Sequence, residues 1–251
     1  MKAIFVADAN PAYVGFWEPQ AIHMWERHGL QSILYYIAPE PNPALFSSEY
    51  AKVKHIPMVS TVPAIVQALF AKWYFPGHEQ TDERLFICDI DCFVLSPKFV
   101  HRVVQGTDIF HLKPMDKGHV PGYYVAGTPS QLRTFFRAED ITFEDFCLRA
   151  LRESTYVFPT KADVSPFSLT ASPDWRYFGS EEHYAGACAA AYTGSTDASI
   201  EAPSPYENRI SRDSFYNPTR LARGDYIDYH CPRPFEAFDS TILHIVKSPC
   251  A

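Results

Sequence analysis

Apolar and polar positions alternate in blocks along the first half of the chain. Short apolar runs typical of buried strands occupy four stretches: 3–7, 32–38, 84–95 and 108–113. Helix start and stop residues bracket the segments between them; Pro19 and Gly29, for example, enclose one predicted helix. Strands that alternate with helices build a mostly parallel sheet covered on both faces. The pattern therefore predicts an α/β fold with a mostly parallel central sheet flanked by helices.

The second half of the chain carries further helix starts and one long irregular stretch. Two pairs have capping-box spacing and predict helix starts: Thr128 with Gln131, and Thr142 with Asp145. Residues 194–224 are rich in Pro, Ser, Asn and Asp without periodicity, which predicts a long loop of the kind that often serves function. The apolar runs YIDYHC (226–231) and TILHIVK (241–247) are expected to be strands.

Composition and charge narrow the class of protein. With 251 residues, 47% of them hydrophobic, the chain can bury one large core, so a single domain over 1–251 is expected. A formal charge of -7 and the lack of a basic run exclude an electrostatic nucleic-acid binder. The first residues lack the long apolar region of a secretory signal, and no stretch is long and apolar enough to span a bilayer. Since the six cysteines form no disulfide framework, we expect reduced thiols and a cytoplasmic protein.

Two aspartates end the apolar run LFICDIDCFVL. A continuous strand would place Asp89 and Asp91 on one face, because side chains alternate with a period of two. Neighbouring carboxylates repel each other unless a cation neutralises them, and their hard oxygens suit Mg²⁺ or Mn²⁺. The pair therefore predicts a divalent metal site, whereas the simpler interpretation is two solvated carboxylates at a strand exit.

The surrounding passage VQALFAKWYFPGHEQTDERLFICDIDCFVLSP resembles the glycosyltransferases of GT-A fold, in which a helix with a basic residue precedes an apolar strand and D-x-D. The resemblance implies a single Rossmann-like GT-A domain, with a nucleotide-binding part over 1–113 and a sugar and acceptor part over 114–251. It implies that Asp89 and Asp91 coordinate Mn²⁺ or Mg²⁺ on the diphosphate of a nucleotide sugar. It also implies that Lys72 approaches the nucleotide or its phosphates.

Further along, DWRYFGSEEHYAGACAAA resembles the family region that supplies an acidic residue near the transferred sugar. The resemblance makes Glu181 and Glu182 candidate catalytic residues. The alternative interpretation is structural, since Ser180 could cap a helix whose dipole favours acidic side chains in its first turn.

Some GT-A enzymes take a third metal ligand from a late histidine and a diphosphate contact from a lysine soon after it. By this resemblance, TILHIVK supplies His244 and Lys247, the favoured pair, while YHCPRPF supplies His230 and Arg233 as the competing pair. An imidazole ligand would favour Mn²⁺ over Mg²⁺.

Two residues near the N-terminus are further candidates for contacting the nucleotide. Asp8 follows the first predicted strand, and Tyr13 begins an aromatic loop. The Tyr13 ring could stack on the base, or the loop could simply be packed against the protein.

The resemblance implies transfer of a sugar from a UDP- or GDP-sugar to a saccharide or glycoconjugate acceptor in polysaccharide or glycoconjugate assembly. The order of D-x-D, late acidic pair and terminal His/Lys favours a retaining enzyme. One alternative is a haloacid-dehalogenase-like phosphohydrolase with Asp89 as nucleophile, although Phe93 stands where that family has Thr or Val. Another is a non-catalytic carbohydrate-binding protein on a transferase-like fold.

Overall fold

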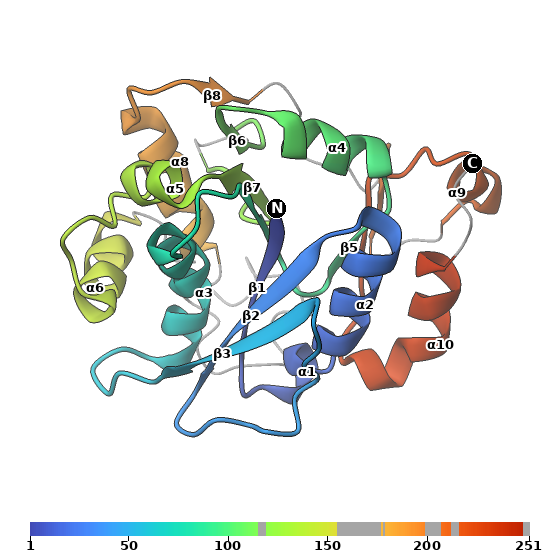
Figure 1. Ribbon diagram of the computed structural model, residues 1–251, viewed down its shortest axis with the longest axis horizontal. Coiled ribbons are helices and arrows are strands. Elements are labelled where there is room, and N and C mark those ends of the chain that lie inside the picture. Colours follow the sequence, from blue (N-terminus) through green and yellow to red (C-terminus); the bar gives the residue numbers. More distant parts are fainter. Residues whose placement is uncertain (115–118, 155–176, 178, 199–206, 212–215, 248–251) are drawn as a thin grey trace.

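The computed structural model describes residues 1–114, 119–154, 177, 179–198, 207–211 and 216–247. Its centre is a seven-stranded sheet (Figure 1). In spatial order the strands are β3 (Ala51–Pro57), β2 (Gln31–Ala38), β1 (Lys2–Asp8), β4 (Leu85–Cys88), β7 (Tyr124–Gly127), β6 (Ile109–His111) and β8 (Thr196–Asp197). All neighbours pair in parallel except β7, which runs antiparallel to β4 and β6. The predicted α/β fold with a mostly parallel sheet is confirmed.

A smaller three-stranded sheet lies beside the first. Its strands are β5 (Cys92–Val94), β10 (Asp228–His230) and β9 (Arg209–Ile210), with β10 in the middle. Three segments far apart in sequence therefore meet in this sheet. Residues 194–224, predicted as one irregular loop, contribute β8, β9 and the short helix α9 (Pro218–Ala222), and parts of that stretch lie outside the described residues.

Helices cover both faces of the large sheet (Figure 1). The helices and the one 3-10 turn are α1 (Pro11–Val14), α2 (Trp17–His28), α3 (Ala64–Tyr74), η1 (Phe75–His78), α4 (Pro97–Gln105), α5 (Pro129–Phe135), α6 (Phe143–Glu153), α8 (Ser180–Ala191), α9 and α10 (Phe235–Val246). Strand alternation divides the core into two clusters: Phe5 belongs to the one that includes buried residues of α2, α4 and α10, and the preceding residue, Ile4, belongs to the one that includes residues of α3, α5, α6 and α8. Among the described residues, no helix is long and apolar enough to cross a membrane.

Local signals account for several element ends. Gly29 adopts φ 65°, a left-handed conformation that ends α2 and that side chains with a Cβ rarely adopt. The predicted capping box of Thr128 and Gln131 is present at α5, and Thr142 accepts from the Asp145 amide at α6. These predictions are confirmed.

The last predicted strand is wrong. TILHIVK belongs to helix α10, which begins directly after Pro234. Its buried residues, Ile242, Ile245 and Val246, recur at helical spacing, and the helix packs them into the same core cluster as α2. The other late prediction, YIDYHC, is confirmed as β10.

Candidate active site

The two aspartates of the D-x-D segment lie in a turn between two sheets. Strand β4 ends at Cys88, the Cys92 amide donates to the Asp89 carbonyl at 3.1 Å, and β5 begins at Cys92. The prediction that one strand continues through the motif is wrong, because β5 pairs with β10 instead of extending the large sheet. Asp89 and Asp91 therefore share a site through a turn rather than through one strand face. Their side chains are 33% and 7% exposed, so Asp91 is the more enclosed carboxylate.

A cleft of about 250 Å³ lies next to this turn. It opens at the carboxyl ends of β1 and β4, which are neighbours in the sheet. From β1 the chain continues to β2 and β3 on one side, and from β4 it continues to β7 and β6 on the other side. Such a switch point leaves a crevice in which α/β proteins commonly bind ligands. Residues predicted from the sequence that line it are Asp8, Tyr13, Lys72, Asp89, Asp91, Glu181 and Glu182.

Lys72 lies between two acidic side chains of the cleft, Asp89 and Glu181. Its Nζ lies 2.9 Å from Asp89 Oδ1 and 3.8 Å from Glu181 Oε1. Burial by itself lowers the pKa of Lys72, but the nearby carboxylates of Asp89 and Glu181 outweigh it, so the pKa lies above its ordinary value. A Cβ at Gly122 would lie 3.0 Å from Lys72 Nζ and 3.2 Å from the Trp73 ring, so a larger residue there would force the lysine amine to shift by a few tenths of an ångström.

Glu181 and Glu182 occupy the first turn of α8 and face the cleft. The expectation that Ser180 caps the helix is wrong: Gly179 is the N-cap with φ 85°, and Ser180 Oγ donates to the Tyr177 carbonyl. Burial raises the pKa of both carboxyls, to about 7 for Glu181. The Gly122 amide donates to Glu182 Oε1 at 3.2 Å. The pair is therefore not a solvated helix start, and Glu181 can exchange a proton near neutral pH.

Asp91 contacts a second set of residues that line the same cleft. His230 Nε2 and Arg233 Nε each lie 3.4 Å from Asp91 Oδ2. Antiparallel pairing of β10 with β5 sets His230 opposite Cys92, and the Cys231 amide donates to the Asp91 carbonyl at 2.8 Å. The small sheet thus positions His230 at the D-x-D turn.

These residues fit a divalent metal. The possible ligand atoms of Asp91, Cys92 and His230 lie within 4.8 Å of one another. Burial raises the pKa of the Cys92 thiol well above its ordinary value, which disfavours the thiolate. Carboxylate oxygen and imidazole nitrogen are then the favoured donors, a combination compatible with Mn²⁺.

A buried ion pair supports β10 and was not predicted from the sequence. Arg209 Nε on β9 donates to Asp228 Oδ1 at 2.8 Å, and the Tyr124 hydroxyl donates to Asp228 Oδ2 at 2.7 Å. Asp228 is fully buried and precedes His230 by two residues. Its partners are 19 and 104 residues away, so no local sequence signal indicated the network.

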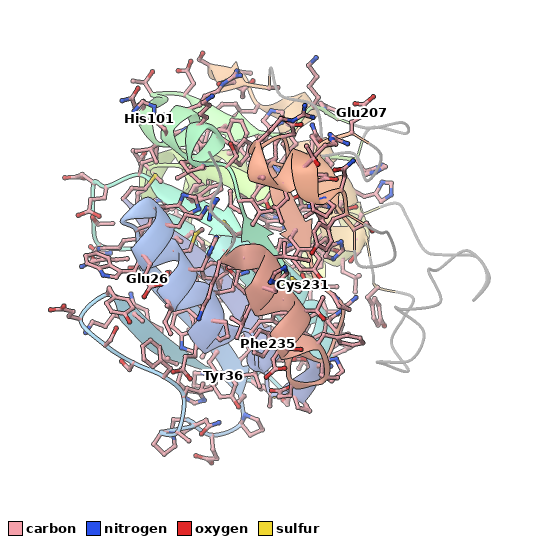
Figure 2. All side chains as sticks on the ribbon, turned by 90° about the vertical axis from the view of Figure 1, so that its right-hand side faces the viewer. Glu26, Tyr36, His101, Glu207, Cys231 and Phe235 are labelled. Carbon is pink, nitrogen blue, oxygen red and sulfur yellow. The ribbon has the colours of Figure 1, made fainter. Side chains whose placement is uncertain are left out.

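His244 and Lys247 lie apart from this cleft. His244 is in the last turn of α10, and Lys247 follows the helix and lines a separate hollow of about 760 Å³. Residues of α2 and α10 form that hollow, and Figure 2 shows these two helices side by side, with Glu26 on α2 and Phe235 at the start of α10. Between the two candidate pairs, the structure brings His230 and Arg233 to Asp91.

The similarity of this chain to known proteins lies in structure rather than in sequence. No protein-family model matches the chain, and no curated protein matches it. A solved structure of the galactosyltransferase LgtC, in complex with donor and acceptor sugar analogs, is similar over 92% of this chain and 87% of its own, with 10% identity and a TM-score of 0.47.

Proposed function

We propose that this chain is a metal-dependent glycosyltransferase that moves a sugar from a nucleoside diphosphate sugar to a saccharide or glycoconjugate acceptor. One observation carries the proposal. A single cleft at the switch point of the sheet combines the D-x-D turn and His230 with a buried cluster of Lys72 and two glutamates. Breaking a sugar–diphosphate bond requires both parts, a site for the phosphates and polar groups for the sugar. The division into a nucleotide part (1–113) and an acceptor part (114–251) belongs to this proposal.

The phosphate side is assigned to the D-x-D turn. Asp91 and His230 would hold the divalent ion, with Asp89 beside them, and the bound ion supplies Lewis-acid stabilisation of the leaving diphosphate. Lys72 carries a positive charge at the same edge and stabilises negative charge that grows on the leaving group. Asp8 and Tyr13 line the same cleft and are assigned to the nucleotide, with the Tyr13 ring available to the base.

The sugar side is assigned to the glutamates. Glu181 lines the cleft, and its buried Oε2 has no hydrogen-bond partner among the described residues, so its carboxyl has acceptor capacity that a sugar hydroxyl can use once the side chain turns toward the cleft. Glu182 is fixed by the Gly122 amide, which keeps its carboxyl at the cleft. We propose that the transfer retains the configuration at the anomeric carbon. In such a reaction neither glutamate has to act as general base toward the acceptor.

A nucleotide-binding experiment tests the proposal. Calorimetry with UDP and GDP, with and without Mn²⁺, is expected to show metal-dependent binding to the wild-type protein. Asp91→Asn should abolish it, whereas Asp82→Asn, at an exposed position away from the cleft, should leave it unchanged. No binding of either nucleotide in the presence of Mn²⁺ would refute the proposal.

The phosphohydrolase and carbohydrate-binding alternatives give different results. A phosphohydrolase would trap a fluoroberyllate adduct on Asp89, the carboxylate that Lys72 contacts. A binding protein would retain saccharide binding in Asp91→Asn and would hydrolyse no nucleotide sugar.

A further inference from the structure

Arg233 is a buried cation at the metal-ligand carboxylate. Its side chain is 12% exposed and lines the cleft, and its Nε lies 3.4 Å from Asp91 Oδ2. Among the described residues, Asp91 is the acidic side chain within ion-pair distance of Arg233. The guanidinium also lies 4.6 Å from the centre of the Tyr13 ring, a geometry in which the ring face attracts a cation.

The same carboxylate oxygen is shared by two partners. Asp91 Oδ2 contacts Arg233, and it is also the atom nearest His230 Nε2, the proposed imidazole ligand. A divalent ion on Asp91 and His230 would lie close to the guanidinium, and like charges at such distances repel. Arg233 and a divalent ion therefore compete for Asp91.

Arg233 also has unused capacity for an anion. A guanidinium has five N–H donors in a planar fork that matches phosphate oxygens, and the contact with Asp91 uses the Nε edge. An anion that enters the cleft can therefore accept hydrogen bonds from the Arg233 donors that Asp91 does not use. A diphosphate is an anion of this kind.

We propose that Arg233 makes metal binding depend on the diphosphate: it neutralises Asp91 until a diphosphate enters, and then releases Asp91 to the metal by turning to the phosphates. The inference rests on the proposed function. Two ligands that each favour the same arrangement of Arg233 bind cooperatively, and the coupling is reciprocal. In the arrangement that the structure shows, the Tyr13 ring holds the guanidinium at the cleft.

Mn²⁺ titration followed by electron paramagnetic resonance of the free ion tests this coupling. Arg233→Met removes the charge and keeps an unbranched side chain. We expect it to bind Mn²⁺ alone about tenfold more tightly than the wild type, and to lose most of the increase in Mn²⁺ affinity that UDP or GDP causes. Because each nucleotide binds Mn²⁺ in solution equally in both samples, the comparison between proteins isolates the contribution of Arg233. Arg223→Met is the matched control, since Arg223 is exposed and pairs with Asp225.

The outcomes separate this inference from the proposed function. A wild type that binds Mn²⁺ with UDP or GDP, together with an Arg233→Met protein whose affinity for Mn²⁺ alone is unchanged or weaker, overturns the role of Arg233 only. Absence of Mn²⁺ binding in both proteins, with either nucleotide present, overturns both proposals. Arg233→Gln, also neutral, replaces the Met variant if thermal unfolding shows that the Met variant is not folded.

Discussion

Two histidines of α2 share one backbone carbonyl at the end of β5, the strand that follows the D-x-D turn. His23 Nε2 lies 2.7 Å and His28 Nε2 lies 2.8 Å from the Val94 oxygen, which ends β5. A carbonyl oxygen has two lone pairs and accepts from both rings. Burial lowers the pKa of His23 to about 3 and that of His28 to about 4. Both rings are therefore neutral in the folded protein at neutral pH, and acid is the perturbation that charges them.

The pKa values set the size of the acid effect. In the unfolded chain both histidines titrate near 6.5, so below that pH the unfolded state binds protons that the folded state does not. The free energy of unfolding therefore keeps its full value above pH 6.5 and decreases as the pH falls from 6.5 toward the pKa values of the folded state. At pH 5 each ring costs about 2 kcal/mol, and the pair about 4 kcal/mol. Since a domain is typically stable by about 5–15 kcal/mol, this loss is large.

Urea unfolding at pH 8 and pH 5 measures the effect. The comparison is between the wild type and the double variant His23→Gln/His28→Gln, whose amide N–H groups can still donate to Val94 but do not titrate. Other groups respond to pH as well; burial raises the pKa of Glu181 to about 7, which opposes the histidines. Only the difference between the two proteins is therefore interpreted. We expect the wild type to lose about 4 kcal/mol more than the variant.

The result that refutes the reasoning is equal loss of stability in both proteins between pH 8 and pH 5. It would mean that the rings already carry charge in the folded state, or that their contacts with Val94 do not depend on the neutral form. Single variants then distinguish the two rings, with His23, the more buried, expected to contribute at least as much as His28.

Three further predictions concern the cleft and its support. Glu181→Gln should raise the melting temperature more at pH 8 than at pH 5, because a raised folded pKa means that stability is lost as pH rises through about 7; an increase independent of pH would contradict this. Gly122→Ala should lower Mn²⁺-dependent nucleotide affinity about two- to tenfold in calorimetry, because the added Cβ forces the Lys72 amine to shift by a few tenths of an ångström. Asp228→Asn should lower the free energy of unfolding in urea by about 3–5 kcal/mol, because it leaves Arg209 buried without a charged partner; a loss below 1 kcal/mol would argue against the ion pair.

The elements with local signals were predictable from sequence. The alternation of apolar strands with capped helices gave the α/β class, and residues such as Gly29 and Thr128 marked the correct helix ends. The two aspartates of the cleft were also predictable, because carboxylates beside buried apolar runs are costly without a partner, while Glu181 was predicted from the resemblance to GT-A enzymes. Asp89, Asp91 and Glu181 all line the cleft that the structure forms.

Contacts between residues far apart in the sequence were not predictable from local sequence signals. His230 and His244 each precede a basic residue by three positions, and the sequence favoured His244 by a narrow margin. Pairing of β10 with β5 instead brings His230 to Asp91, while helix α10 holds His244 away from the cleft. The Arg209 contact depends on the same small sheet.

For Asp89 and Asp91, the sequence by itself determined that two carboxylates follow a buried strand and need positively charged partners. Only the tertiary structure decided which residues are those partners: Lys72 lies at Asp89, and His230 and Arg233 lie at Asp91. The physical reason is that composition and periodicity act over a few neighbouring residues. Sheet pairing, in contrast, joins segments more than a hundred residues apart, and its register is set by the packing of the whole core.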